Sequence, residues 1–364
     1  MIRMKCRARF PRTLSVFVII LSLVPASRAA ETVFPGKTWT RSTPEEQGLD
    51  PAPLAEIDGL MKKAKANGAL IRNGYLVAEW NYAGPPETRI DIQSCGKCIT
   101  SMMLGVALTD GVIPSIDTKV RDVWPEFDAG KYSDQITFRH LVTMTSGIAN
   151  TIYGGQFPHY GVVFPPGKMS RYHNNQPWEI SRALTYLYGR PLKDVLRERI
   201  LDSLDAGEVV WNAYGEVKAK SGETVPISEG FGCHQMTASD LARIGLLYLN
   251  GGVWNGKRLL SADYVKESLT DIPQPLIDYR SEARWHGQTA QDRADDVATL
   301  RYGFAWWSRT FYEKDEWYMS GNGSQFCFLF PKENMVMTKI NDWRNEVQFN
   351  HQDFYPLVKK AARR

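Results

Sequence analysis

The fold is decided by residues 94–110, which read SCGKCITSMMLGVALTD. From Ile99 onward, apolar residues occupy nearly every side of a helix with 3.6 residues per turn, and Gly111 follows as a helix stop signal. A helix that is apolar all round is buried inside a protein. We therefore expect this helix at the centre of the molecule, with Ser94 and Lys97 in its first turn.

Ser94 and Lys97 are three residues apart, so their side chains share one face of that helix. A helix amino terminus offers free N–H groups and a positive dipole end, which stabilise an alkoxide. Burial lowers the pKa of a lysine and so frees its amine to accept a proton. The competing interpretation is a capping serine beside a surface lysine, which the apolar residues that follow disfavour. Gly96 fits either close packing or substrate approach, and the pattern leaves both open.

A second candidate is Tyr172-His173-Asn174, just after Pro165-Pro166-Gly167. The phenol of Tyr172, if it lies near a lysine ammonium, ionises more easily and relays a proton to a leaving group. The amide of Asn174 can hold the lysine or a substrate carbonyl. The competing interpretation is a turn followed by the start of a helix.

A third candidate is the run Gly321-Asn322-Gly323-Ser324-Gln325, which opens a predicted strand. Small residues at a strand start let a substrate lie along its edge. Backbone N–H groups there can complete an oxyanion hole with the N–H of Ser94. The competing interpretation is an ordinary hairpin turn.

Taken in order, the three motifs resemble those of the serine β-lactamase and penicillin-binding-protein superfamily. The chain looks most similar to its class C β-lactamase-like branch, which includes esterases and small-amide hydrolases. The resemblance covers about residues 40–360 and is carried further by residues 136–147, 237–245, 254–260 and 302–307.

The resemblance implies a role for each motif. Ser94 matches the nucleophile, Lys97 its proton acceptor, and Tyr172 the residue that shares general-base and general-acid work. Asn174 matches the residue that binds the lysine and the substrate amide. The run Asn322-Gly323-Ser324 falls on the third motif, and the backbone N–H of Gln325 is then the second oxyanion donor.

Asn322 departs from the pattern, because relatives usually carry Lys or His at this position. A cation there pairs with the carboxylate of a β-lactam or a peptide terminus, a bond worth about 1.5–3 kcal/mol. A neutral amide favours an esterase or amidase that acts on a less charged acyl substrate. It also leaves an alternative open, a weakly active or non-catalytic protein that binds acyl ligands or peptidoglycan fragments.

The order of predicted elements indicates an α+β fold with a β-lactamase-like, two-lobed architecture. A helix is expected at 51–67 and a hairpin at 69–82 around Asn73-Gly74, before a long helical middle. Strands follow at 300–309, 316–319, 325–330 and 335–340, and then a helix at 352–362. We expect an arm at 30–48 and a catalytic domain at 49–362. Its antiparallel sheet lobe would combine 49–93 with 295–362, and its helical lobe would be 94–294.

Residues 1–29 have the features of a secretory signal peptide, with a basic head, an apolar run and a small-residue cleavage site. The apolar run, residues 14–26, is shorter than the ~20 residues that span a bilayer. We expect cleavage near Ala29 and a periplasmic or extracellular destination, without a membrane span after cleavage. An uncleaved anchor is the alternative.

The net charge and the cysteine content limit which partners and cofactors are expected. The chain carries +4, and residues 1–29 hold six basic and no acidic residues, so the remainder carries −2. This charge gives no reason to expect a nucleic-acid partner, and the expected partner is a small acyl substrate.

The scattered histidines and the cysteine spacing give no metal pattern, so no metal or other cofactor is expected. We expect Cys95, Cys98, Cys233 and Cys327 to be buried thiols, although a disulfide pairing stays open. Of Trp306 and Trp307, one is expected in the core.

Overall fold

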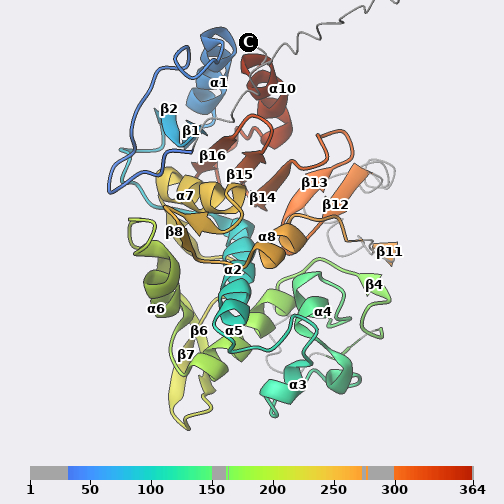
Figure 1. The fold of residues 1–364 in the computed structure, drawn as a ribbon. Coiled ribbons are helices and arrows are strands. Elements are labelled where there is room, and N and C mark those ends of the chain that lie inside the picture. Colours follow the sequence, from blue (N-terminus) through green and yellow to red (C-terminus); the bar gives the residue numbers. More distant parts are fainter. Residues whose placement is uncertain (1–31, 150–160, 163, 273–275, 278–298, 363–364) are drawn as a thin grey trace, which may run out of the picture. The chain divides into compact units, whose positions relative to one another are not determined.

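The computed structural model describes residues 32–149, 161–162, 164–272, 276–277 and 299–362. The predicted signal peptide at 1–29 therefore lies outside the described residues. The main element is a seven-stranded antiparallel sheet in the order β12-β13-β14-β15-β16-β1-β2 (Figure 1). Its strands come from both ends of the sequence: β1 Ala66–Arg72, β2 Tyr75–Asn81, β12 Leu300–Tyr302, β13 Trp307–Arg309, β14 Trp317–Gly321, β15 Gln325–Phe330 and β16 Met335–Asn341. The predicted α+β class is confirmed.

The turn between β1 and β2 forms where the sequence predicts it. Asn73 and Gly74 both have positive φ, 53° and 83°, which is the backbone of a two-residue hairpin turn. The single strand predicted at 300–309 is wrong, because the segment forms β12 and β13. Between them Gly303 fits tightly against the backbone of Ser268, and Ala305 has a φ of 67°, so the chain turns there.

Two terminal helices pack together and share a core with the sheet. They are α1, Pro51–Lys63, and α10, His351–Ala361. Their buried side chains join those of the sheet strands in one hydrophobic cluster, which includes Met61, Phe326 and Phe354. Side-chain caps fix both helix starts, Asp50 for α1 and Asn350 for α10.

A second hydrophobic cluster contains the buried helix that follows Ser94. Here α7, Ala238–Leu249, contacts β1, β15 and β16, while α2, Gly96–Thr109, contacts α5, Asn175–Tyr188 (Figure 1). Every residue of α2 from Gly96 to Ala107 is buried, as its all-round apolar pattern predicts. The glycine Gly105 lies directly against the ring of Tyr264 on α8, Ala262–Ser268. The expected central helix is therefore confirmed, apart from its first residues, which form a 3₁₀ turn, η1, Gln93–Cys95.

The middle of the chain contains short helices and small sheets. The helices are α3 Val120–Val123, η2 Ser133–Gln135, α4 Phe138–Val142 and α6 Leu192–Leu196, which continues into a π-helical turn, Arg197–Leu201. One small sheet has the order β3-β8-β5, and β6 pairs with β7. Their bounds are β3 Ile90–Asp91, β5 Val210–Trp211, β6 Ala213–Lys218, β7 Thr224–Ser228 and β8 His234–Met236. Two further two-stranded sheets pair β4 Met169–Ser170 with β11 Leu276–Ile277, and β9 Val253–Trp254 with β10 Lys257–Arg258.

The structure also shows the state of the cysteines. The four cysteines among the described residues are free thiols, of which Cys95, Cys98 and Cys327 are buried and Cys233 is half-buried. The expectation of four buried thiols is thus wrong for Cys233. Within the described part of the chain, no helix combines the length and apolarity that crossing a membrane requires.

Candidate active site

Ser94 lies in the 3₁₀ turn that leads into α2, and Asp91 holds this turn. The carboxylate of Asp91 accepts hydrogen bonds from the backbone N–H and the side-chain amide of Gln93, both at 2.8 Å. Gln93 has a φ of 52°, a strained conformation for a residue with a side chain. Burial raises the pKa of Asp91, while these bonds from Gln93 oppose the rise. Asp91 therefore stabilises a strained residue that directly precedes Ser94.

Lys97 reaches back to Ser94 from the first turn of α2. Its Nζ donates to the Ser94 hydroxyl oxygen at 2.9 Å and to the carbonyl of Phe231 at 3.0 Å. Lys97 is only 1% exposed, whereas Ser94 is half-buried and so accessible from outside. The spacing of three residues thus produces direct contact, and the amine does not point to bulk solvent.

Gly96, between these two residues, is required for close packing. A Cβ at this position would overlap the ring of His234, which is itself fully buried and packs against Trp211 in a tilted arrangement with ring centroids 4.2 Å apart. The φ of Gly96 is −57°, so the backbone conformation does not require glycine. The structure therefore supports the packing interpretation of Gly96.

Tyr172 joins the same group from the segment before α5. The Nζ of Lys97 lies 5.0 Å from the centroid of the Tyr172 ring. Tyr172 is half-buried and packs against Trp307 at 5.0 Å and Tyr302 at 6.3 Å between ring centroids. Trp307 is thus half-buried beside the site, whereas Trp306 is fully buried in the core, as expected of one member of this pair.

Asn174 is the residue immediately before α5 and is 8% exposed. Its neighbour His173 is 3% exposed, and its Nδ1 accepts a hydrogen bond from the N–H of Asn175 at 3.1 Å. Burial lowers the pKa of His173 to about 3, and it does the same to His234. Both imidazoles beside the site are therefore neutral at neutral pH.

The third motif forms the hairpin turn between β14 and β15, closed by the pair Gly321 and Gln325. It lies next to η1, because Gly321 fits against the carbonyl of Ile92 and the thiol of Cys95 donates to the carbonyl of Gln325 at 3.6 Å. Gly323 and Ser324 both have positive φ, 80° and 62°. Asn322 is exposed at the tip of this turn. The second motif thus contacts the first through Tyr172 and Lys97, and the third contacts it through Gln325 and Cys95.

Two further groups, for which no motif was found, are Glu229, whose carboxyl interacts with Lys97, and Cys233, whose thiol interacts with Glu229. Glu229 is 8% exposed, and burial raises the pKa of its carboxyl, while the charge of Lys97 lowers it. The thiol of Cys233 is hydrogen-bonded to Glu229, and burial together with this carboxyl raises the pKa of Cys233 to about 12. Both residues lie in a stretch without a readable periodicity, so no local signal pointed to them.

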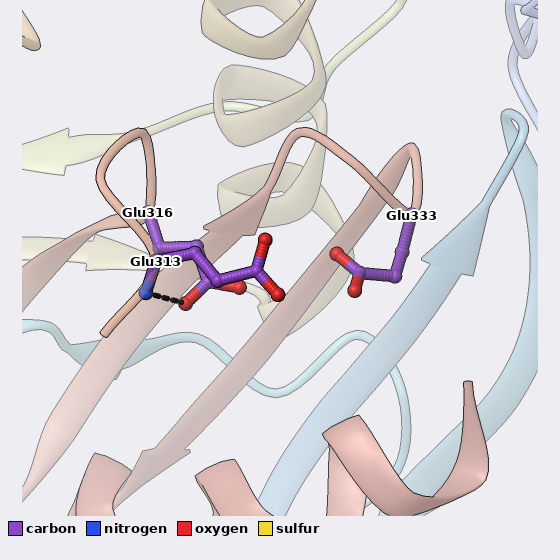
Figure 2. A group of neighbouring side chains, drawn as sticks. All are labelled: Glu313, Glu316 and Glu333. Atoms are coloured by element: carbon purple, nitrogen blue, oxygen red, sulfur yellow. Dashed lines mark hydrogen bonds between the residues drawn. The ribbon is translucent and has the colours of Figure 1, made fainter. Parts of the chain in front are cut away.

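Three carboxylates gather elsewhere, at the opposite end of β14 from Gly321. Figure 2 shows Glu313, Glu316 and Glu333, whose oxygens lie within 4.8 Å of one another. The ammonium of Lys359 donates to all three, with distances of 2.8 Å to Glu313 and to Glu316. The cluster therefore contains its own cation, and its chemistry is that of an ion-pair network.

Comparisons with known proteins address the fold and the family of this chain. A search of the curated proteins found no match. Among solved structures, a penicillin-binding protein homologue from Caulobacter crescentus is similar, with 16% identity, a TM-score of 0.62, and coverage of 85% of this chain and 97% of that one. A D-stereospecific amidohydrolase from Streptomyces sp. has 16% identity, a TM-score of 0.60, and coverage of 84% and 98%. A family VIII carboxylesterase has 14% identity, a TM-score of 0.62, and coverage of 90% and 99%.

At such identities these structures establish the fold alone. The family comparison goes further, because the Beta-lactamase family matches residues 55–353, which is most of the sequence. The expected superfamily resemblance is confirmed, and the family indicates a hydrolase. The chain belongs to the Beta-lactamase family.

Proposed function

We propose that this protein is a serine hydrolase that cleaves an ester or amide bond through an acyl-enzyme on Ser94. The observation that carries the proposal is the hydrogen bond between the buried amine of Lys97 and the hydroxyl of Ser94. An accessible serine in the 3₁₀ turn that leads into a buried helix, beside a buried amine from the first turn of that helix, is an arrangement that activates a hydroxyl as a nucleophile.

Lys97 is the proposed proton acceptor. The amine lies 2.9 Å from the Ser94 oxygen and donates to the carbonyl of Phe231. In its neutral form it would keep the bond to Phe231 and take the proton of Ser94 on its lone pair. The Ser94 oxygen then bonds to the substrate carbonyl carbon, and the bond to the leaving group breaks. Tyr172, whose ring lies against Lys97, passes the proton to the leaving group. A water molecule, deprotonated by the same pair, releases the acyl group and restores Ser94.

The proposed oxyanion hole consists of two backbone N–H groups, those of Ser94 and Gln325. Both belong to turns that lie against each other, as the contact between the Cys95 thiol and the Gln325 carbonyl requires. Asn174, the residue before α5, is the proposed partner of the substrate amide. Donors fixed in advance stabilise the tetrahedral intermediate without reorganisation, and each one typically contributes about 10²–10³ in kcat.

The substrate we propose is an acyl ester or amide without a carboxylate beside the scissile bond. Asn322 is neutral and exposed at the tip of the third-motif turn, so it offers no charge-assisted bond to such a carboxylate. The half-buried rings of Tyr172 and Trp307 add an apolar surface beside Ser94. A carboxylesterase and an amidohydrolase are among the proteins of similar fold, which is consistent with this substrate class.

Labelling with a fluorophosphonate tests the proposal. We expect one covalent adduct on the peptide that contains Ser94, hydrolysis of short acyl esters or amides, and loss of both in Ser94→Ala. A chromogenic β-lactam in the same screen should be a poorer substrate than the esters. Adduct formation that persists in Ser94→Ala would rule out Ser94 as the nucleophile.

The neutral Asn322 also favours a second candidate, a protein that binds acyl ligands or peptidoglycan fragments with little or no turnover. The variants Asn322→His and Asn322→Lys separate the two candidates. If the wild-type protein binds these ligands without ever releasing product, and the added cation starts turnover, the binding function is the correct one.

We further propose that the protein is exported and that residues 1–29 are removed. The basic head and short apolar run of this segment support the proposal. Amino-terminal sequencing of the protein recovered from periplasm and medium should give a start near Ala30. A protein that keeps Met1 and stays with the membrane fraction would instead identify an anchor.

A further inference from the structure

Lys339 is a buried amine that the proposed mechanism does not use. It lies within β16 and is 0% exposed. Side chains alternate along a strand, so Lys339 shares the face of Met335 and Met337, which belong to the cluster with Phe354 of α10. A lysine in such a position is rare unless its ammonium has specific partners.

The partners of Lys339 belong to the third-motif turn and its support. Its Nζ donates to the carbonyl oxygen of Ser324 at 3.0 Å and to the Oδ1 of Asn341 at 2.8 Å. The side chain of Gln325 is fixed to the same strand: its Nε2 donates to the carbonyl of Asn341 at 2.5 Å, and its Oε1 accepts from the Asn341 N–H at 2.8 Å. The residues on both sides of one peptide bond are thus attached to β16.

That peptide bond joins Ser324 to Gln325. Its carbonyl and its N–H lie in one plane and point in opposite directions, because a peptide unit is planar and trans. A carbonyl held toward Lys339 therefore directs the N–H of Gln325 away from Lys339. A cation at the carbonyl oxygen also polarises the unit and strengthens the N–H as a donor.

We propose that Lys339 is a positioning residue that orients and polarises the Ser324–Gln325 peptide so that its N–H stabilises the oxyanion. The proposal rests on the proposed function, in which this N–H is the second oxyanion donor. Where Asn322 contributes no charge to the third motif, Lys339 supplies a cation from the neighbouring strand. Its charge acts through the backbone and leaves the substrate side of the turn neutral.

The charge of Lys339 should change within the neutral pH range. Burial lowers the pKa of this lysine to about 7, against an opposing effect of Asp353 on α10. Cys95 on η1 is the other titratable group that acts on it. Burial raises the pKa of that thiol well above its ordinary value, so Cys95 stays neutral while Lys339 titrates.

A spectroscopic test follows this peptide directly. Ser324–Gln325 is the only Ser–Gln sequence in the chain, so combined labelling with carbonyl-¹³C serine and ¹⁵N glutamine gives one correlated amide signal. Between about pH 5.5 and 8.5 this signal should shift in the wild type with a midpoint near the pKa of Lys339, and stay still in Lys339→Met. A wild-type signal that does not shift, or that shifts equally in Lys339→Met, overturns the proposal whether or not the protein turns substrate over.

A kinetic test asks whether the positioning matters for the reaction. In Lys339→Met, kcat and kcat/KM should fall together by about 10–100-fold with KM unchanged, since an oxyanion donor acts in the transition state. Lys339→Arg, which keeps a cation, should recover part of the rate. Thr338→Val is the matched control, because Thr338 is equally buried on the same strand but donates to the carbonyl of Ala238 instead.

The outcomes separate the two proposals. A wild-type protein that neither turns over esters nor labels at Ser94 contradicts the proposed function, while the amide titration still decides whether Lys339 controls the peptide. An active wild type in which Lys339→Met loses no more rate than Thr338→Val contradicts the positioning role alone.

Discussion

Replacing Lys359 with methionine should strongly destabilise the protein without affecting its site. The ammonium of Lys359 joins the carboxylates of Glu313, Glu316 and Glu333 and so ties α10 to both ends of the β14–β15 hairpin segment. The side chain of Glu316 is 1% exposed and that of Glu333 is 11% exposed. In the variant both carboxylates would therefore lack their counter-ion at positions that water hardly reaches. Figure 2 shows how closely the three acidic groups approach one another.

The magnitude follows from the burial of each partner. Removing one member of a buried ion pair typically costs about 3–5 kcal/mol. Glu316 keeps two hydrogen bonds, from the hydroxyl of Tyr355 at 2.8 Å and the N–H of Glu313 at 2.9 Å, which retain part of this stabilisation. Glu313 is 40% exposed, so its pair contributes under about 1 kcal/mol. We expect Lys359→Met to lower the free energy of unfolding by about 2–4 kcal/mol.

Urea unfolding followed by circular dichroism measures the difference, with Lys360→Met as the control. Lys360 is adjacent in sequence but 62% exposed, and its partner Glu56 lies 3.5 Å away and is 58% exposed. Its loss should cost about 0.5 kcal/mol or less. Ester turnover per folded molecule should stay unchanged in both variants. Equal urea midpoints for Lys359→Met and Lys360→Met would refute the reasoning.

Three further changes test the site and its surroundings. Gly96→Ala should destabilise the protein. Overlap of the new Cβ with His234 costs about 1–3 kcal/mol, which outweighs the gain of about 1 kcal/mol in helix propensity. A variant more stable than the wild type contradicts this. Asp91→Ala should slow labelling of Ser94 at least about 10-fold by releasing Gln93, and an unchanged labelling rate contradicts it. Lys339 has a pKa of about 7 in the folded protein, so above pH 7 the folded chain releases a proton that the unfolded chain keeps. The free energy of unfolding of the wild type should therefore rise with pH, relative to that of Lys339→Met, by up to about 1.4 kcal/mol per pH unit. Parallel pH profiles for the two proteins contradict this.

The parts of the fold with a local signal could be predicted from the sequence. The Asn73-Gly74 turn specifies its own backbone, and the apolar run of α2 requires burial whatever surrounds it. The strand Gln325–Phe330 lies where its composition predicts it. The small sheet β3-β8-β5 could not be predicted, because strands of two or three residues acquire their pairing from partners distant in sequence.

The candidate site divides in the same way. The contact between Ser94 and Lys97 follows from their spacing of three residues across the 3₁₀ turn and the start of α2, whereas the approach of Tyr172 was expected from the family resemblance alone. Glu229 had no sequence signal. Lys339 did have one: a single lysine inside the apolar strand Met335–Asn341 is a charge that needs a partner, and only the fold shows that the partner is the third-motif turn.

The most direct test of the central claim is the rate at which a fluorophosphonate labels Ser94 in the wild type and in Lys97→Met. If the buried amine activates the hydroxyl, the wild type should label stoichiometrically at Ser94 and the variant at least about 100-fold more slowly, with the fold retained. Equal labelling rates in the two proteins, or an adduct on another residue, would contradict the account.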